Sequence, residues 1–119
     1  MYIRRELGIW GENIAIRYLQ KNDYIIIERN FSCRQGEIDI IAKDTNKNEL
    51  VFFEVKTRTN NKYGTPVDAV NKLKRNHICR CAEYYIYKYK LYKVFIRFDI
   101  IEITVKKGTF NINQIKNAF

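Results

Sequence analysis

The sequence predicts a single α/β domain in which two helices pack on a mixed β-sheet. Two long segments repeat apolar residues at helical spacing, and five segments are rich in β-branched and aromatic residues. One helical segment lies between two β-rich ones, which is typical of a crossover between parallel strands. The 119 residues suit one domain, residues 1–119, and a hydrophobic fraction of 46% is enough to build a core.

The first half of the chain is predicted to form a helix and then three strands. Apolar and small residues recur at helical spacing over residues 3–21, with Glu12 at the edge of that stripe. A polar loop is expected over residues 32–36 and a hairpin connection over residues 44–49. The connections are short, so we expect an antiparallel meander of strands over residues 24–29, 37–43 and 50–57.

The second half is predicted to form a helix and two strands. Thr65 can cap the helix, Pro66 suits its first position, and Asp68 completes a capping box. This helix should run to about residue 87, with Leu73 and Tyr85 on its buried face. A strand parallel to the third is expected over residues 92–105, and a last strand over residues 109–115. The predicted order is therefore α-β-β-β-α-β-β.

Charged residues interrupt two of the predicted strands. Asp39 lies in the apolar run of the second strand, and Glu54 and Lys56 lie in that of the third. Strand side chains alternate, so Glu54 and Lys56 share a face, and in an ordinary hairpin register Asp39 sits across from Glu54. Two buried carboxylates so close together would be stabilised by a divalent cation. The alternative is an inter-strand salt bridge that involves Lys56.

The chain is strongly basic, with 22 Lys and Arg against 13 Asp and Glu and a formal net charge of +9. This balance favours a polyanionic partner, most simply nucleic acid, although net charge does not distinguish DNA from RNA. The residues expected to contact phosphates are at the end of the third strand and the start of the second helix: Arg58, Lys72, Lys74 and Arg75. A solvated basic face is the alternative for the helix residues.

Several other classes of protein are not supported by the sequence. Three cysteines without a secretion signal argue against a disulfide framework, and His77 is the only histidine available to a catalytic triad. No apolar run is long enough to cross a bilayer, so we expect a cytoplasmic protein that does not bind membranes.

Arg97 and Asp99, two apart on one predicted strand, are expected to form a buried pair.

Five stretches carry a resemblance to a known family: "GENIAIRYL", "ERNFSCRQGEIDIIAKD", "VFFEVKTR", "AVNKLKRNHICRCAEYYI" and "RFDII". Together they resemble the YraN-like family of small bacterial proteins over nearly the whole chain. The order of an acidic residue on the first helix, an Asp on one strand and Glu-x-Lys on the next is similar to the PD-(D/E)xK, or restriction-endonuclease-like, nuclease superfamily. Ile38 stands where that superfamily's motif has proline, which removes no ligand.

This resemblance implies a three-layer α/β/α sandwich and a metal-dependent endonuclease that acts on DNA, including branched or damaged DNA. Asp39 and Glu54 match the residues that bind Mg²⁺ or Mn²⁺, and Lys56 matches the catalytic lysine. Glu12 resembles the helix-one glutamate that archaeal Holliday-junction resolvases place near the metal. Those resolvases act as symmetric dimers, so the resemblance also implies a homodimer. The alternative is a binding module or accessory subunit that retains the fold without cleaving nucleic acid.

Overall fold

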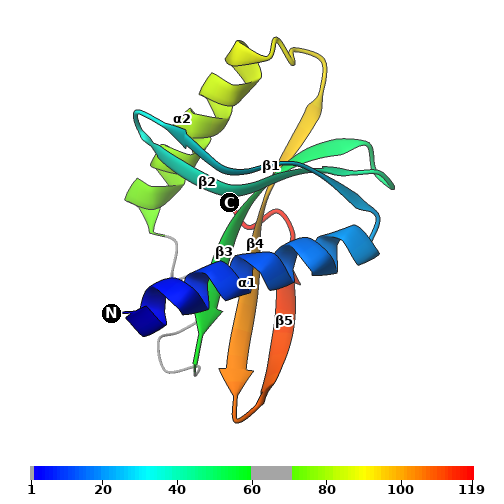
Figure 1. Cartoon of the computed structure of the whole chain (residues 1–119). Helices are drawn as coiled ribbons and strands as arrows, with labels where there is room; N and C mark the ends of the chain where they lie inside the picture. Colours follow the sequence, from blue (N-terminus) through cyan, green and yellow to red (C-terminus); the bar gives the residue numbers. More distant parts are fainter. Residues whose placement is uncertain (1, 60–70) are drawn as a thin grey trace.

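The computed structural model describes residues 2–59 and 71–119, with side chains from Arg5 onward in the first helix. The element order is the predicted one (Figure 1). Neither helix, over its described residues, has the length and apolar character that crossing a membrane requires. The elements are α1 (Tyr2–Lys21), β1 (Tyr24–Cys33), β2 (Gly36–Asp44), β3 (Glu49–Arg58), α2 (Lys72–Lys88), β4 (Phe95–Lys106) and β5 (Thr109–Ile115).

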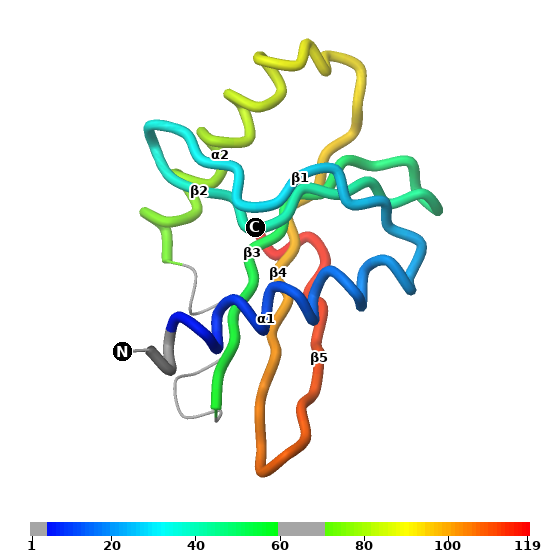
Figure 2. The backbone as a smooth tube through the Cα atoms, in the orientation of Figure 1, coloured from blue at the N-terminus to red at the C-terminus, as the bar shows by residue number. Residues whose placement is uncertain are grey.

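The strands form one mixed sheet in the order β1-β2-β3-β4-β5. β3 and β4 are parallel because α2 connects them, and the other neighbouring pairs are antiparallel. The backbone trace shows α1 crossing one face of the twisted sheet while α2 lies on the other (Figure 2). The predicted three-layer α/β/α arrangement is therefore confirmed.

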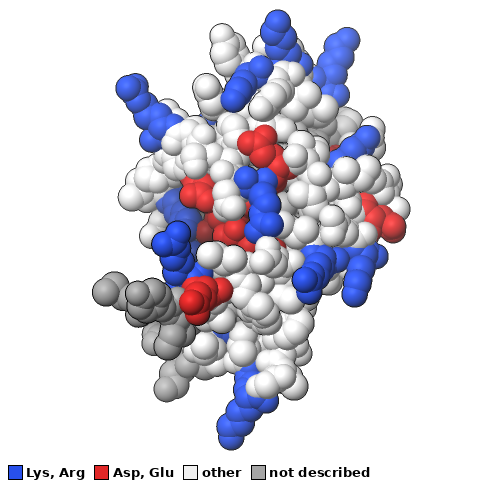
Figure 3. Space-filling model, viewed as in Figure 1, with Lys and Arg blue, Asp and Glu red and all other residues white. Residues whose placement is uncertain are grey.

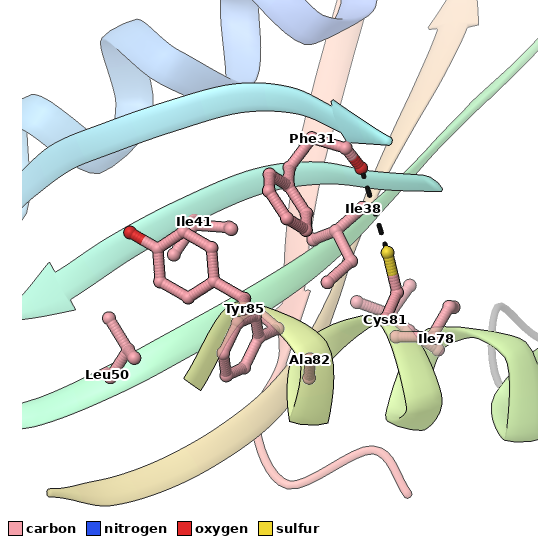
Figure 4. Packing of buried hydrophobic residues seen from close by; sticks show 10 residues of the cluster. Phe31, Ile38, Ile41, Leu50, Ile78, Cys81, Ala82 and Tyr85 are labelled. Carbon is pink, nitrogen blue, oxygen red and sulfur yellow. Dashed lines mark hydrogen bonds between the residues drawn. The ribbon is translucent and has the colours of Figure 1, made fainter. Parts of the chain in front are cut away.

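Two apolar clusters, one on each face, hold the layers together. Side chains of β3 alternate between them: Val51 and Phe53 pack under α1, whereas Leu50 and Phe52 pack under α2. Figure 4 shows the α2 cluster, where Tyr85 and Cys81 point towards the sheet. Phe52 and Phe53 are at most 1% exposed, and truncating such a phenylalanine to alanine costs about 3–5 kcal/mol. The side chains of β3 therefore alternate between the two faces, as the sequence predicts for a strand.

β1 is longer than predicted, and most of the expected loop over residues 32–36 belongs to strands. The side chain of Phe31 is buried against α2, and pairing with β2 continues to the Cys33–Gly36 pair. The register shifts between Ile26 and Glu28, and Asn30 adopts φ 53°. These irregularities keep the strand paired through a stretch whose polar composition is typical of a loop.

The described part of α2 begins at Lys72, where Asn71 is the N-cap and its side chain accepts a hydrogen bond from the Lys74 amide at 2.9 Å. The predicted capping box over residues 65–68 lies outside the described residues. The prediction that Leu73 is buried is wrong, since it is 64% exposed in the first helical turn. β4 begins at Phe95 rather than at residue 92.

A closed polar cluster lies within the sheet, and we call it the Arg97 network. The Arg97 guanidinium donates to Asp99 (2.9 and 3.1 Å), Asp44 (3.0 Å), Glu49 (2.7 Å) and the Tyr24 hydroxyl (2.6 Å). The Gln114 amide adds hydrogen bonds to Tyr24 and Asp99, and the backbone of Asn117 donates to Asp99. The predicted Arg97–Asp99 pair is confirmed, within a larger network.

Candidate functional site

The candidate site forms where β2 and β3 separate. Their regular pairing ends with Ile40 opposite Phe53, so Asp39 and Glu54 are the next residues on the two strands. Asp39 Oδ2 accepts a hydrogen bond from the backbone N–H of Val55 at 2.8 Å. A side-chain carboxylate therefore satisfies a strand N–H beyond the last regular pair, and the two strands open into a notch.

Asp39 and Glu54 face the same pocket and not opposite sides of the sheet. The pocket has a volume of about 380 Å³. It is bordered by Gly36 and Glu37 of β2 and by the start of α2, including Lys74. We call this pocket, with Asp39 and Glu54 at its wall, the acidic pocket. The predicted juxtaposition of the two carboxylates is thus present in the structure.

Two lysines lie on one oxygen of Glu54, whose side chain is only 5% exposed. Lys74 Nζ is 2.7 Å from Glu54 Oε1, and Lys56 Nζ is 3.3 Å from the same atom. The salt bridge with Lys56, considered above as the alternative to a metal site, is therefore present at Glu54. At Asp39 no ion pair with a lysine or arginine is found among the described residues.

Burial and crowding shift the proton affinities of these groups. Burial and the neighbouring charge of Glu54 raise the pKa of Asp39 to about 7, although the Val55 N–H acts in the opposite direction. Burial lowers the pKa of Lys56, helped by the ammonium of Lys74 and opposed by Glu54. For Lys74 burial also lowers the pKa, but its short contact with Glu54 outweighs this and the net shift is upward. Of the two lysines, Lys56 is the one that loses its proton more easily.

Glu12 approaches this region from α1. The helix lies very close to β3 at Gly11, where an added Cβ would overlap Thr57 Oγ1 and lie 3.0 Å from Thr57 Cβ. With its amide oriented to donate, Asn30 bridges Glu12 (3.1 Å) and Glu37 (3.0 Å), and Arg29 lies 3.9 Å from Glu12. Burial raises the pKa of Glu12, with smaller contributions from the charges of Glu37 and Glu54.

The donor set of the acidic pocket suits a hard divalent cation bound in an open site. Within residues 2–59 and 71–119 no group of three or more His, Cys, Asp or Glu side chains is arranged to hold a metal. Mg²⁺ and Mn²⁺ do not require such a cage, because Mg²⁺ commonly binds one or two carboxylates, waters and a substrate phosphate. Asp39 and Glu54 meet that requirement, whereas Glu12 as a third ligand stays a prediction.

The predicted phosphate-contacting residues have different surroundings. Arg58 Nε is 3.7 Å from Glu102 Oε2 on β4, and the Arg75 guanidinium lies 5.9 Å from the centre of the Phe119 ring. Lys72 is exposed at the first residue of α2. Lys74 alone among the four makes an ion pair with a carboxylate of the acidic pocket, in the part of the chain that the structure describes. Their roles in nucleic-acid binding stay predictions.

The sequence did not predict two features of this site. Lys74 was expected on the outer helix surface, and its contact with Glu54 depends on how the start of α2 packs against the sheet, which no local pattern encodes. Asn30 was not singled out, although asparagine is one of the residues that tolerates a positive φ and such positions often serve a local purpose.

Comparison with known proteins identifies similar chains. Residues 11–103 match the sequence model of a family described as "Uncharacterised protein family UPF0102". A UPF0102 protein of Clostridium botulinum (strain 657 / Type Ba4) is 47% identical over 121 residues, covering 99% of this chain and 97% of the relative. A UPF0102 protein of Caldicellulosiruptor saccharolyticus is 46% identical over 118 residues, covering 98% of each. The resemblance to the YraN-like family is confirmed by these matches, and neither name states an activity.

Proposed function

The chain belongs to the UPF0102 family, and we propose that it is a metal-dependent endonuclease that hydrolyses phosphodiester bonds of DNA. One observation carries the proposal. Asp39 and Glu54, from adjacent strands, face one pocket with lysine amines at 2.7 and 3.3 Å from Glu54. Carboxylates for a cation and amines for phosphates are what hydrolysis of a phosphodiester needs in one place.

Asp39 and Glu54 are the residues that would hold Mg²⁺ or Mn²⁺ in this proposal. The bound ion would neutralise charge on the scissile phosphate and make a coordinated water more acidic. Asp39 Oδ2 is already oriented by the Val55 N–H, which fixes the direction of its carboxylate before any cation arrives. Glu12 would act from α1 as a further acidic group beside the site.

Lys56 is the proposed catalytic lysine. Its pKa is lowered by burial and by the Lys74 ammonium, so a larger share of Lys56 Nζ is unprotonated near neutral pH than in a free lysine. An unprotonated amine beside the acidic pocket can orient the attacking water and accept its proton. When protonated, the same amine can contact the phosphate that develops negative charge.

The charge of the molecule supports a nucleic-acid substrate. The formal net charge is +9, and on the face viewed in Figure 3 acidic side chains gather near the centre with Lys and Arg around them. Arg58, Lys72 and Arg75 are the further residues proposed to contact the phosphate backbone, which would make binding salt-sensitive. Branched or damaged DNA, and a symmetric dimer that cuts two strands, belong to the proposal as the family resemblance implies them.

A second candidate function is a module that binds nucleic acid without cleaving it. Two observations favour it. The described residues contain no three-ligand metal group, and Glu54, a proposed ligand, already has two cationic partners. Under this alternative the lysines would hold phosphates and the carboxylates would only limit the local positive charge.

The two functions are separated by a cleavage and binding assay. The protein is incubated with linear, nicked, flapped and four-way-junction DNA in Mg²⁺, Mn²⁺ or EDTA, and products and complexes are both measured. We expect metal-dependent products that fall at least about a hundredfold in Asp39→Ala, Glu54→Ala and Lys56→Ala, since each removes a group acting on the reacting atoms. Binding without products in any metal would establish the non-catalytic module instead.

A further inference from the structure

Glu54 has more positive charge beside it than a single carboxylate requires. One of its oxygens receives both Lys74 at 2.7 Å and Lys56 at 3.3 Å, and its side chain is 5% exposed. One ammonium at hydrogen-bond distance is enough to neutralise a buried carboxylate. The second brings two like charges close together, an arrangement that needs a reason.

The two lysines differ in how firmly they are held. Lys56 projects from a residue of β3 that is paired with Glu102 of β4, and its side chain is 24% exposed. Lys74 projects from the first turn of α2, and its side chain is 44% exposed although its tip rests on Glu54. A flexible four-carbon side chain at a helix start can swing into solvent without disturbing the sheet. Lys74 is therefore the partner that Glu54 can exchange.

We propose that Lys74 is an internal counter-ion that holds the metal position of Glu54 until a divalent cation displaces it, and that the displaced ammonium then binds a backbone phosphate. This inference rests on the proposed function and deepens it. A cation arriving at Asp39 and Glu54 would meet the ammonium of Lys74 at 2.7 Å from a ligand oxygen, so the two compete. The short contact that stabilises the metal-free site therefore weakens metal binding.

The exchange couples the metal to the nucleic acid. A phosphate at the pocket gives the displaced Lys74 a new partner, which makes it easier for the metal to take its place. Coupling between two ligands is reciprocal, so the metal strengthens nucleic-acid binding by the same factor by which nucleic acid strengthens metal binding. Metal would accordingly bind weakly to the protein alone and tightly to its complex with DNA.

The experiment measures Mn²⁺ affinity by calorimetry in the wild type, Lys74→Met and Lys43→Met. Lys43 is an exposed lysine on β2, so the control removes the same charge from another place on the surface. Binding of a labelled four-way-junction DNA is measured with and without Ca²⁺, used here as a hard cation to follow binding apart from cleavage. Circular dichroism checks the fold, and Lys74→Gln replaces Lys74→Met if that variant is unfolded.

We expect Mn²⁺ to bind at least about tenfold more tightly to Lys74→Met than to the wild type without DNA, because a charge-assisted contact no longer competes. The gain should persist at high salt, since a direct contact is screened less than a distant charge. The enhancement of DNA binding by Ca²⁺ should shrink in Lys74→Met alone. An unchanged or weaker Mn²⁺ affinity in Lys74→Met, a gain lost at high salt, or an unchanged Ca²⁺ effect would each overturn the inference.

These measurements test the role of Lys74 separately from the proposed nuclease activity. DNA cleavage by the wild type with an unchanged Mn²⁺ affinity in Lys74→Met would leave the nuclease standing and remove the role of Lys74. The expected affinity change without any cleavage would keep the counter-ion and remove the nuclease. A wild type that binds no divalent cation even with DNA present would overturn both.

Discussion

The Arg97 network and the acidic pocket both place carboxylates in one sheet, but the two regions distribute their cations differently. In the network three carboxylates surround one guanidinium, yet each receives a hydrogen bond from it, and Asp99 accepts further bonds from Gln114 and Asn117. In the acidic pocket both lysines lie on Glu54, and Asp39 receives a single backbone N–H from the described residues.

The proton affinities of the two regions differ accordingly. Burial opposes ionisation of Asp44, but Arg97 and the backbone N–H groups of Lys47 and Asn46 together outweigh it and hold the pKa of Asp44 below its ordinary value. Burial and the charge of Glu54 raise the pKa of Asp39 to about 7. A carboxylate surrounded by donors stabilises the fold, whereas one left short of donors beside a second carboxylate retains affinity for a ligand that could supply positive charge.

The largest contrast is expected on removal of one cation from each region. Arg97→Met should lower the free energy of unfolding by about 3–5 kcal/mol, because it leaves buried carboxylates without their donor. Lys74→Met should lower it by at most about 1 kcal/mol, since Lys56 remains beside Glu54 and Lys74 is half-exposed. Urea denaturation monitored by circular dichroism measures both. Equal losses in the free energy of unfolding would show that both regions depend on their cations to the same extent.

A second contrast concerns pH. The folded pKa of Asp39, about 7, lies above its ordinary value of 3.8, so its contribution to stability is fully present below about pH 4 and is lost as the pH rises through about 7. Asp39→Asn should abolish this loss, raising the free energy of unfolding at pH 8 by about 1 to 4 kcal/mol relative to the wild type, with little change at pH 4. Denaturant titrations across this range make the measurement.

Asp44→Asn is the matched variant in the Arg97 network, and its sign is opposite. The folded pKa of Asp44 is lowered, so its contribution is present at neutral pH and is lost only as the pH falls below its ordinary value of 3.8. We expect Asp44→Asn to destabilise the protein at neutral pH by about 1–3 kcal/mol. A stabilising Asp44→Asn or a destabilising Asp39→Asn at pH 8 would reverse the comparison.

A small effect, no larger than that expected of the Asp39 and Asp44 variants, is expected at Asn30, whose amide bridges Glu12 and Glu37 beside the acidic pocket. Asn30→Gly retains the positive φ and removes the amide, so the two carboxylates lose a shared donor and stability should fall by about 1 kcal/mol. Asn48→Gly is the control, because Asn48 has nearly the same φ, 55°, in the β2–β3 turn. Thermal unfolding that shifts equally in both variants would show that the bridge contributes nothing.

Much of the fold could be predicted from the sequence because its signals are local. Alternation along β3 predicted which side chains share a face of the sheet, although not which helix covers each face, and the same rule paired Arg97 with Asp99. Turn-forming residues predicted the β2–β3 hairpin. The parallel arrangement of β3 and β4 followed from the helix between them.

The remainder depends on contacts between residues far apart in the chain. Tyr24 and Asp44 reach Arg97 from β1 and β2, and Gln114 of β5 joins the network through Tyr24; no spacing in the sequence indicates these contacts. β1 extends to Cys33 because the side chain of Phe31 is buried against α2. The sequence did not indicate this, because the polar residues around Phe31 are typical of a loop. In the candidate site, hairpin pairing and strand alternation predicted that Asp39 and Lys56 would both lie near Glu54. The contact of Lys74 with Glu54 was not predicted, because it depends on the position of α2.

The hydrogen bond from the Val55 N–H to Asp39 has a consequence for comparing relatives across evolution. If the proposed catalysis were lost in a relative, an acceptor at this position would still be useful, because without it the Val55 N–H would lose its partner. Among the described residues the Lys56 side chain makes no hydrogen bond to the backbone, and Lys74 can neutralise Glu54 in the absence of Lys56. Under the proposed nuclease function, loss of Lys56, more than loss of Asp39, should therefore mark relatives that do not cleave DNA.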